Sequence, residues 1–136
     1  MQTLTTNELA LRFEEDIVRV RQLARTAATE AGLSLVDQTK LVTAASELAR
    51  NTVVYGGGGV ARVEVVKSAN GRNGVKLAFV DSGPGIPNIE LALKDGWTSG
   101  SGLGLGLSGS RRLVDEFELK SEPGAGTSIV VVKWSR

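Results

Sequence analysis

Glu47 and Asn51 are four residues apart in the segment Glu47-Leu48-Ala49-Arg50-Asn51, so in a helix they share one face, one turn from each other. The amide oxygen of Asn51 is a hard ligand that suits Mg²⁺, which also takes phosphate oxygens and waters. The carboxylate of Glu47 can accept a proton from an attacking hydroxyl. Taken alone, the pair is more often a plain surface pair on an amphipathic helix.

Asp81 stands where an apolar segment runs into Gly83-Pro84-Gly85. The glycines permit close backbone approach and dihedral angles that other residues avoid. An aspartate in this place can accept a hydrogen bond from an exocyclic amine such as that of adenine. A turn-forming aspartate before a Gly-Pro turn is the commoner reason for the same pattern.

Residues 100–109 are rich in glycine and lead into an apolar segment. Bare backbone N–H groups next to the N-terminus of a helix suit a polyphosphate. Residues 104–109 match the dinucleotide pattern G-x-G-x-x-G by letter, but residues 96–102 before them do not form a strand, so we reject that reading. A P-loop is also excluded, because no Gly-Lys pair occurs in the chain. Gly124-Ala125-Gly126-Thr127, taken alone, indicates a hairpin turn.

The composition limits the possible chemistry. The chain has 136 residues, a net charge of +1, no cysteine and no histidine. Its length predicts one domain, residues 1–136. The missing residue types exclude thiolate catalysis, cysteine-ligated zinc and a histidine base or phosphoacceptor. The charge gives no reason to expect nucleic acid or a membrane as partner, and the first residues do not form a signal peptide, so we expect a cytoplasmic protein.

The spacing of apolar residues predicts the elements that position these side chains. Strands are expected at 4–13, 60–67, 75–80, 117–121 and 127–134, and helices at 16–31, from after Ser34 to about 53–55, at 88–94 and at 105–117. Asp16 and Ser34 are the expected N-caps, and Gly32 the expected residue after the first helix. Residues 56–59 and 95–102 are expected to be loops.

The expected core comes from one stripe on each long helix and from residues of the first strand and the last helix. It comprises Leu9, Leu11, Phe13, Ile17, Val20, Ala24, Ala27, Ala28, Ala31, Leu41, Ala44, Ala45, Leu48, Ala49, Leu105, Leu113, Val114 and Phe117. Hairpins imply antiparallel pairing. We therefore predict an α+β fold, a two-layer α/β sandwich with a mixed, mostly antiparallel sheet and helices on one face.

The motifs are weak singly, but their order is specific. Glu-x-x-x-Asn, Asp-x-Gly-x-Gly, Gly-x-Gly-Leu-Gly-Leu and Gly-Thr follow one another at spacings that resemble the ATP site of the gyrase–histidine kinase–MutL superfamily, over residues 10–134. The resemblance implies a Bergerat-type ATP-binding fold with ATP and Mg²⁺ as cofactors. It assigns Glu47 as general base, Asn51 as Mg²⁺ ligand, Asp81 as adenine contact supported by Thr127, and the phosphate-binding residues as Gly83, Gly85, Gly102, Leu103, Gly104 and Gly106.

Within that superfamily, the missing histidine argues against a sensor histidine kinase. The short chain argues against the multidomain machines, and implies a kinase that acts on a separate protein. Residues 46–51, 88–90 with 95–96, and 112–117 look most like RsbT-type serine/threonine switch kinases of bacterial stressosomes. The resemblance implies STAS-domain substrates and scaffolds, and a PP2C-type phosphatase or other output protein as second partner. An anti-sigma factor that sequesters a sigma factor and a non-catalytic adaptor are the alternatives.

Overall fold

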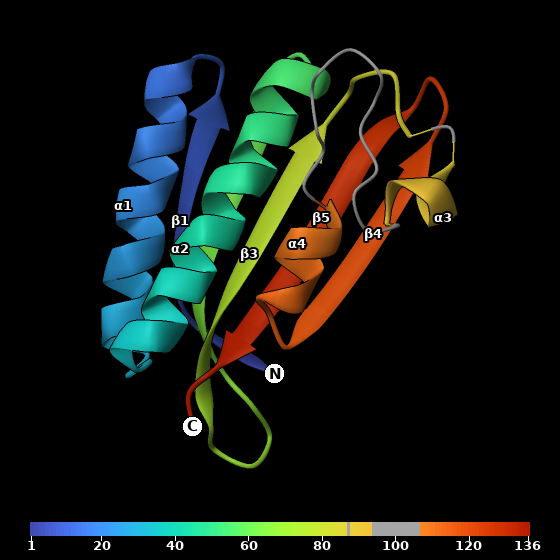
Figure 1. The fold of residues 1–136 in the computed structure, drawn as a ribbon. Helices are drawn as coiled ribbons and strands as arrows, with labels where there is room; N and C mark the ends of the chain where they lie inside the picture. Colours follow the sequence, from blue (N-terminus) through green and yellow to red (C-terminus); the bar gives the residue numbers. More distant parts are fainter. Residues whose placement is uncertain (87, 94–106) are drawn as a thin grey trace.

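Five strands form one sheet in the order β1-β2-β3-β5-β4 in a computed structural model that describes residues 1–86, 88–93 and 107–136 (Figure 1). The strands are β1 (Gln2–Leu11), β2 (Gly59–Lys67), β3 (Asn73–Asp81), β4 (Glu116–Glu122) and β5 (Gly126–Trp134). All four pairings between them are antiparallel. The prediction of a mostly antiparallel sheet is confirmed, and the described strands contain no parallel pair.

The helices cover one face of this sheet, as predicted. They are α1 (Glu14–Glu30), α2 (Leu35–Arg50), α3 (Ile89–Ala92) and α4 (Leu107–Arg112), and a π-helical turn, η1 (Asn51–Tyr55), continues α2. Figure 1 shows α1, α2 and α4 on the same side of the strands. Within the described ranges, no helix has the length and apolar character needed to span a membrane.

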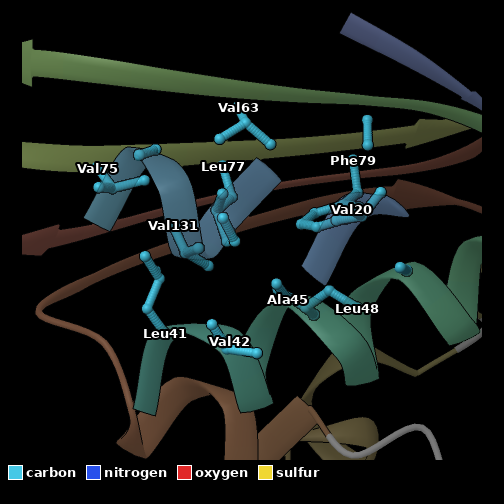
Figure 2. Packing of buried hydrophobic residues seen from close by; sticks show 14 of the residues in the cluster. Val20, Leu41, Val42, Ala45, Leu48, Val63, Val75, Leu77, Phe79 and Val131 are labelled. Carbon is cyan, nitrogen blue, oxygen red and sulfur yellow. The ribbon is translucent and has the colours of Figure 1, made fainter. Parts of the chain in front are cut away.

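The core lies between the two long helices and the sheet. Figure 2 shows Leu41, Ala45 and Leu48 of α2 facing Leu77 and Phe79 of β3. The stripes predicted on both helices are buried throughout, because residues three and four apart return to one helix face. Truncation of a fully buried residue such as Leu48 to alanine would cost about 2–5 kcal/mol of stability.

The first helix begins earlier than predicted. Phe13, not Asp16, is its N-cap, and Asp16 occupies the third helical position. The Asp16 carboxylate accepts hydrogen bonds from the backbone N–H groups of Arg12 (2.8 Å) and Phe13 (3.0 Å). Since the Phe13 side chain is exposed at this corner, the prediction that it joins the core with Leu11 is wrong.

The second helix begins as predicted, with the Ser34 hydroxyl accepting the N–H of Asp37 at 3.1 Å. The prediction that the last helix continues to residue 117 is wrong, because α4 ends at Arg112 and β4 begins at Glu116. The N–H of Asp115 donates to the Val132 carbonyl (2.9 Å). Pairing with β5 therefore replaces the helical hydrogen bonds that the apolar spacing had suggested.

Candidate functional site

Asn51 stands at the junction between α2 and the π-helical turn. Its N–H donates to the Glu47 carbonyl, so the two residues keep the one-turn spacing that the sequence predicted. The N–H of Gly56 donates to the Asn51 carbonyl at 2.9 Å, five residues back. Such a wider turn is often found at functional sites. Here it connects α2 to Gly56, which lies against Asp81, the last residue of β3.

Asp81 ends β3 and lies opposite Thr127 of β5 in the sheet register. Its Oδ1 accepts the N–H of Gly83 at 2.9 Å, and its carboxylate also accepts the N–H of Thr127. Burial raises the pKa of Asp81 above its usual range, and the two N–H donors oppose this shift only in part. A partly buried carboxylate held by the backbone is a preorganised acceptor for a ligand donor.

Gly56 makes room for this carboxylate. A Cβ atom at Gly56 would lie 2.4 Å from Cγ of Asp81, and one at Gly83 would lie 2.6 Å from the Gly56 carbonyl oxygen. Both distances are far below van der Waals contact, so neither position accepts a side chain without movement. The sequence predicted the loop at 56–59 but not this role, which only the contact with Asp81 reveals.

The segment after Asp81 is fixed by hydrogen bonds from three directions. The Tyr55 hydroxyl donates to the Gly85 carbonyl (3.2 Å), and the N–H of Gly124 donates to the Pro84 carbonyl (2.7 Å). Ile86 donates its N–H to the Ser121 hydroxyl oxygen (2.7 Å). No motif predicts these roles of Tyr55 and Ser121, because each is a common residue whose partner is distant in the chain.

Gly85 has a structural requirement of its own. It adopts a positive φ of 75°, and a Cβ atom there would lie 2.1 Å from the Glu122 carbonyl oxygen. The glycine thus lets the segment after β3 pack directly on the turn between β4 and β5.

A narrow pocket opens between these parts. Its cavity volume is about 10 Å³, which is room for about one water molecule. Its polar lining comes from Asn51, Asp81 and Thr127, together with Thr52 and the ring of Tyr55. The apolar walls are Phe79, Ile86, Leu107 and Ile129. Apolar walls with a few convergent polar groups are typical of small-molecule sites.

The structure therefore brings together Asn51, Asp81 and Thr127, which the sequence placed in one site. Glu47 lies one turn before Asn51 on α2 and is half-buried, but it does not line this pocket. Gly83 lies beside Asp81, and Gly85 packs behind it on the β4–β5 turn. The remaining predicted phosphate-binding residues, Gly102, Leu103, Gly104 and Gly106, are outside the described residues, as is the predicted loop at 95–102.

Residues 36–135 match the family described as histidine kinase-, DNA gyrase B-, and HSP90-like ATPases. The chain belongs to this family. The match covers α2, the whole sheet except β1, and every residue that lines the pocket. The resemblance seen in the ordered motifs is thereby confirmed.

Curated members of the family extend the likeness to nearly the whole chain. The protein is 48% identical over 123 residues to the serine/threonine-protein kinase RsbT of Bacillus subtilis (strain 168). The matched residues make up 90% of this chain and 92% of that one. It is 29% identical over 142 residues to an anti-sigma F factor of Clostridium beijerinckii, with 96% of each chain covered.

Two solved structures share the fold of this ATPase family member. One holds the RsbU and RsbW domains of Rv1364c from Mycobacterium tuberculosis, with a TM-score of 0.66 and 22% identity over 97% of this chain and 33% of that chain. The other is the SiaB–SiaC complex from Pseudomonas aeruginosa, with a TM-score of 0.53 and 15% identity over 98% and 91% of the two chains. Both confirm the predicted α+β architecture.

Proposed function

We propose that this protein is a serine/threonine protein kinase that transfers the γ-phosphoryl group of ATP to a partner protein in a partner-switching pathway. The observation that carries the proposal is the 48% identity to a serine/threonine-protein kinase along 90% of the chain. A pocket lined by Asn51, Asp81 and Thr127 supports it. Phosphoryl transfer requires mainly positioning and charge stabilisation, which one nucleotide domain can provide.

Adenine is assigned to the end of the pocket formed by Asp81 and Thr127. The Asp81 carboxylate is held by the N–H groups of Gly83 and Thr127, so it needs little reorganisation to accept the amino group of adenine. The apolar walls, such as Phe79 and Ile129, suit the faces of a purine ring. Gly83, Gly85 and the glycine-rich segment with Gly102, Leu103, Gly104 and Gly106 are assigned to the triphosphate.

Asn51 is assigned to Mg²⁺, because it lines the same pocket and its amide oxygen is a hard ligand. Among the described residues, no group of three or more Asp, Glu, His or Cys side chains is arranged to hold a metal ion. The proposed ion would take its other ligands from phosphate oxygens and water. When bound, the ion would neutralise part of the triphosphate charge.

Glu47 is assigned as the general base. It lies one helical turn from Asn51, and its carboxylate would orient and deprotonate the substrate hydroxyl. The proton moves from the substrate hydroxyl to the Glu47 carboxylate while the hydroxyl oxygen forms its bond to the γ-phosphorus. The bond between the γ-phosphorus and the β–γ bridging oxygen breaks, and ADP leaves with that oxygen.

The proposed substrate is a serine or threonine of a STAS-domain scaffold or antagonist protein in a stress-response pathway. Phosphorylation would release the kinase, which would then activate a PP2C-type phosphatase or another output protein. This part rests on the likeness to RsbT-type kinases.

The proposal is tested by incubating the protein with labelled ATP, Mg²⁺ and a STAS protein from the same genome. We expect label on Ser or Thr of the STAS protein, and transfer roughly 10²–10⁴-fold slower when Glu47→Ala replaces the wild type. No transfer to any such candidate by folded protein that binds ATP would overturn the kinase assignment.

An anti-sigma factor is the second candidate, because the chain is also 29% identical to an anti-sigma F factor over 96% of its length. The higher identity to RsbT favours the switch kinase. Co-purification distinguishes them: a stable complex with a sigma factor would support the anti-sigma factor, and a large STAS-protein assembly would support the switch kinase.

A further inference from the structure

Ser121 contacts two residues that line the pocket, Ile86 and Thr127, through one oxygen atom. It lies in β4, opposite Thr127 of β5. Its Oγ accepts the N–H of Ile86 at 2.7 Å, lies 3.0 Å from the Gly126 carbonyl oxygen, and lies 2.9 Å from Oγ1 of Thr127. The segment after β3 and the start of β5 therefore meet at this hydroxyl.

The number of hydrogens decides the direction of each bond. A serine hydroxyl has one hydrogen and two lone pairs. The Ile86 N–H takes one lone pair of Ser121, and the Gly126 carbonyl, which can only accept, takes the single hydrogen. The 2.9 Å contact is then a hydrogen bond only if the hydroxyl of Thr127 donates to Ser121. This arrangement makes all three contacts hydrogen bonds.

Thr127 consequently has no hydrogen left for a ligand. Towards the pocket, which it lines together with Asp81, its oxygen offers lone pairs only. An ionised Asp81 carboxylate is also an acceptor without a hydrogen. That end of the pocket thus presents two acceptor groups side by side in the register of β3 and β5.

We propose that Ser121 is a positioning residue that, by orienting the hydroxyl of Thr127, makes the pocket select a 6-amino purine over a 6-oxo purine. The proposal rests on the ATP site assigned above. The amino group of adenine supplies hydrogens to the two acceptors, directly or through a water. The O6 atom of guanine is itself an acceptor, so it would face two acceptors with no hydrogen to share. Leaving buried acceptors without a donor costs binding free energy.

The test uses the full chain and isothermal titration with ATP and with GTP, each with Mg²⁺. In Ser121→Ala the hydrogen of Thr127 is free to donate to O6, so we expect the ratio of GTP to ATP dissociation constants to fall by about tenfold. If Ser121 served only to anchor Ile86, both affinities would fall together. An unchanged ratio in the folded variant would overturn the proposal.

Thr127→Val removes the hydroxyl that Ser121 orients. The double variant Ser121→Ala/Thr127→Val should have the same ratio of GTP to ATP dissociation constants as Thr127→Val alone. A further fall in this ratio would contradict the proposal. Ser128→Ala is the matched control, because Ser128 follows Thr127 in β5 and points to the opposite face of the sheet. It should change neither dissociation constant.

Circular dichroism and the melting temperature establish that each variant is folded. If Ser121→Ala does not fold, Ser121→Cys preserves the shape but is a weak acceptor, so the same fall in the ratio is expected and the same unchanged ratio would overturn the proposal. Failure of the wild type to bind ATP would instead overturn the proposed function. Normal ATP binding with an unchanged ratio would overturn only the role of Ser121.

Discussion

At the scale of single residues, the site depends on one partly buried carboxylate, that of Asp81, for which the described part of the chain shows no ion pair. Asp81 is stabilised by two backbone N–H groups, and Gly56 leaves the space that its carboxylate occupies. Backbone donors cannot be removed by a side-chain mutation, whereas the glycine and the aspartate can. These two positions therefore give the sharpest tests of the site.

Asp81→Asn should weaken ATP binding about 5- to 150-fold, because it replaces an acceptor oxygen with a donor at a cost of about 1–3 kcal/mol. Titration calorimetry measures the dissociation constants of the variant and the wild type for ATP and for GTP. Asp115→Asn is the matched control, since Asp115 interacts with Trp134 and Lys133 at the far end of β5, and it should leave ATP affinity unchanged. An equal loss for both nucleotides would contradict a contact specific for adenine.

Gly56→Ala should reduce ATP affinity at least about tenfold, because its Cβ would displace the Asp81 carboxylate from its position. Gly109→Ala provides the control: a Cβ there meets no atom within 4 Å, so neither ATP affinity nor stability should fall. Wild-type ATP affinity in Gly56→Ala would show that the position of this carboxylate does not matter for binding.

Glu47→Gln should leave ATP affinity unchanged and lower the rate of phosphoryl transfer by roughly 10²–10⁴-fold, because the amide cannot accept the substrate proton. The two quantities are measured by calorimetry and by transfer of labelled phosphate to the STAS substrate. Loss of ATP binding in this variant would rule out the role of general base.

At the scale of elements, α2 links the nucleotide pocket at its C-terminus to an ionic cluster at its N-terminus. The buried Lys133 ammonium lies 3.6 Å from both Asp37 of α2 and Asp115 before β4, and Arg136 pairs with Asp115 at 2.7 Å. A buried cation needs such partners to offset its desolvation. The cluster fixes where α2 and the strand β5 meet.

Asp115 makes this cluster sensitive to acid. Burial alone would raise the pKa of Asp115, but the N–H of Trp134 and the charges of Lys133 and Arg136 outweigh it and hold the pKa below its usual value of 3.8. A carboxyl whose pKa is lowered by folding stabilises the protein above its unfolded pKa and loses that contribution as the pH falls through the folded pKa.

Asp115→Asn should therefore lower the free energy of unfolding most clearly near pH 7, and its difference from the wild type should shrink below about pH 4. Urea unfolding at both pH values measures this difference. Glu118→Gln is the control, because Glu118 is exposed and pairs with the exposed Lys120, and it should change stability little at either pH. A constant difference for Asp115→Asn at both pH values would contradict a charge-based role.

At the scale of the whole molecule, the pocket is assembled from segments that lie far apart in the sequence: the end of α2, the end of β3 and the start of β5. A ligand that contacts all three stabilises the folded state by mass action. ATP with Mg²⁺ at a hundred times its dissociation constant should raise the melting temperature on the order of 10 °C.

Differential scanning calorimetry, with and without ATP, checks this shift. At the ATP concentration used for the wild type, the rise in melting temperature should be retained in Glu47→Gln, whose ATP affinity is expected to be unchanged. At the same concentration the rise should be smaller in Asp81→Asn, which binds ATP more weakly. An equal shift in the two variants at one fixed ATP concentration would be inconsistent with the assigned roles.

Local patterns in the sequence determined the elements and the kinds of chemistry. The stripes on both long helices, the hairpins and the spacing of Glu47 and Asn51 depend on residues close in the chain, where helical and strand periods fix the geometry. The same patterns misplaced the first N-cap and lengthened the last helix, because the hydrogen bonds of Asp16 and Asp115 compete with local propensity and leave no periodic signal.

The ordered motifs placed Asp81 and Thr127 in one site, but only the tertiary structure decided how the residues around Asp81 contact it. Gly56 and Thr127 are 25 and 46 positions from it in the sequence, yet both lie against its carboxylate. The bonds of Ser121 to Ile86 and Thr127 likewise depend on how β3, β4 and β5 pair. Sequence spacing specifies a contact only within an element, whereas sheet register and packing specify contacts between elements.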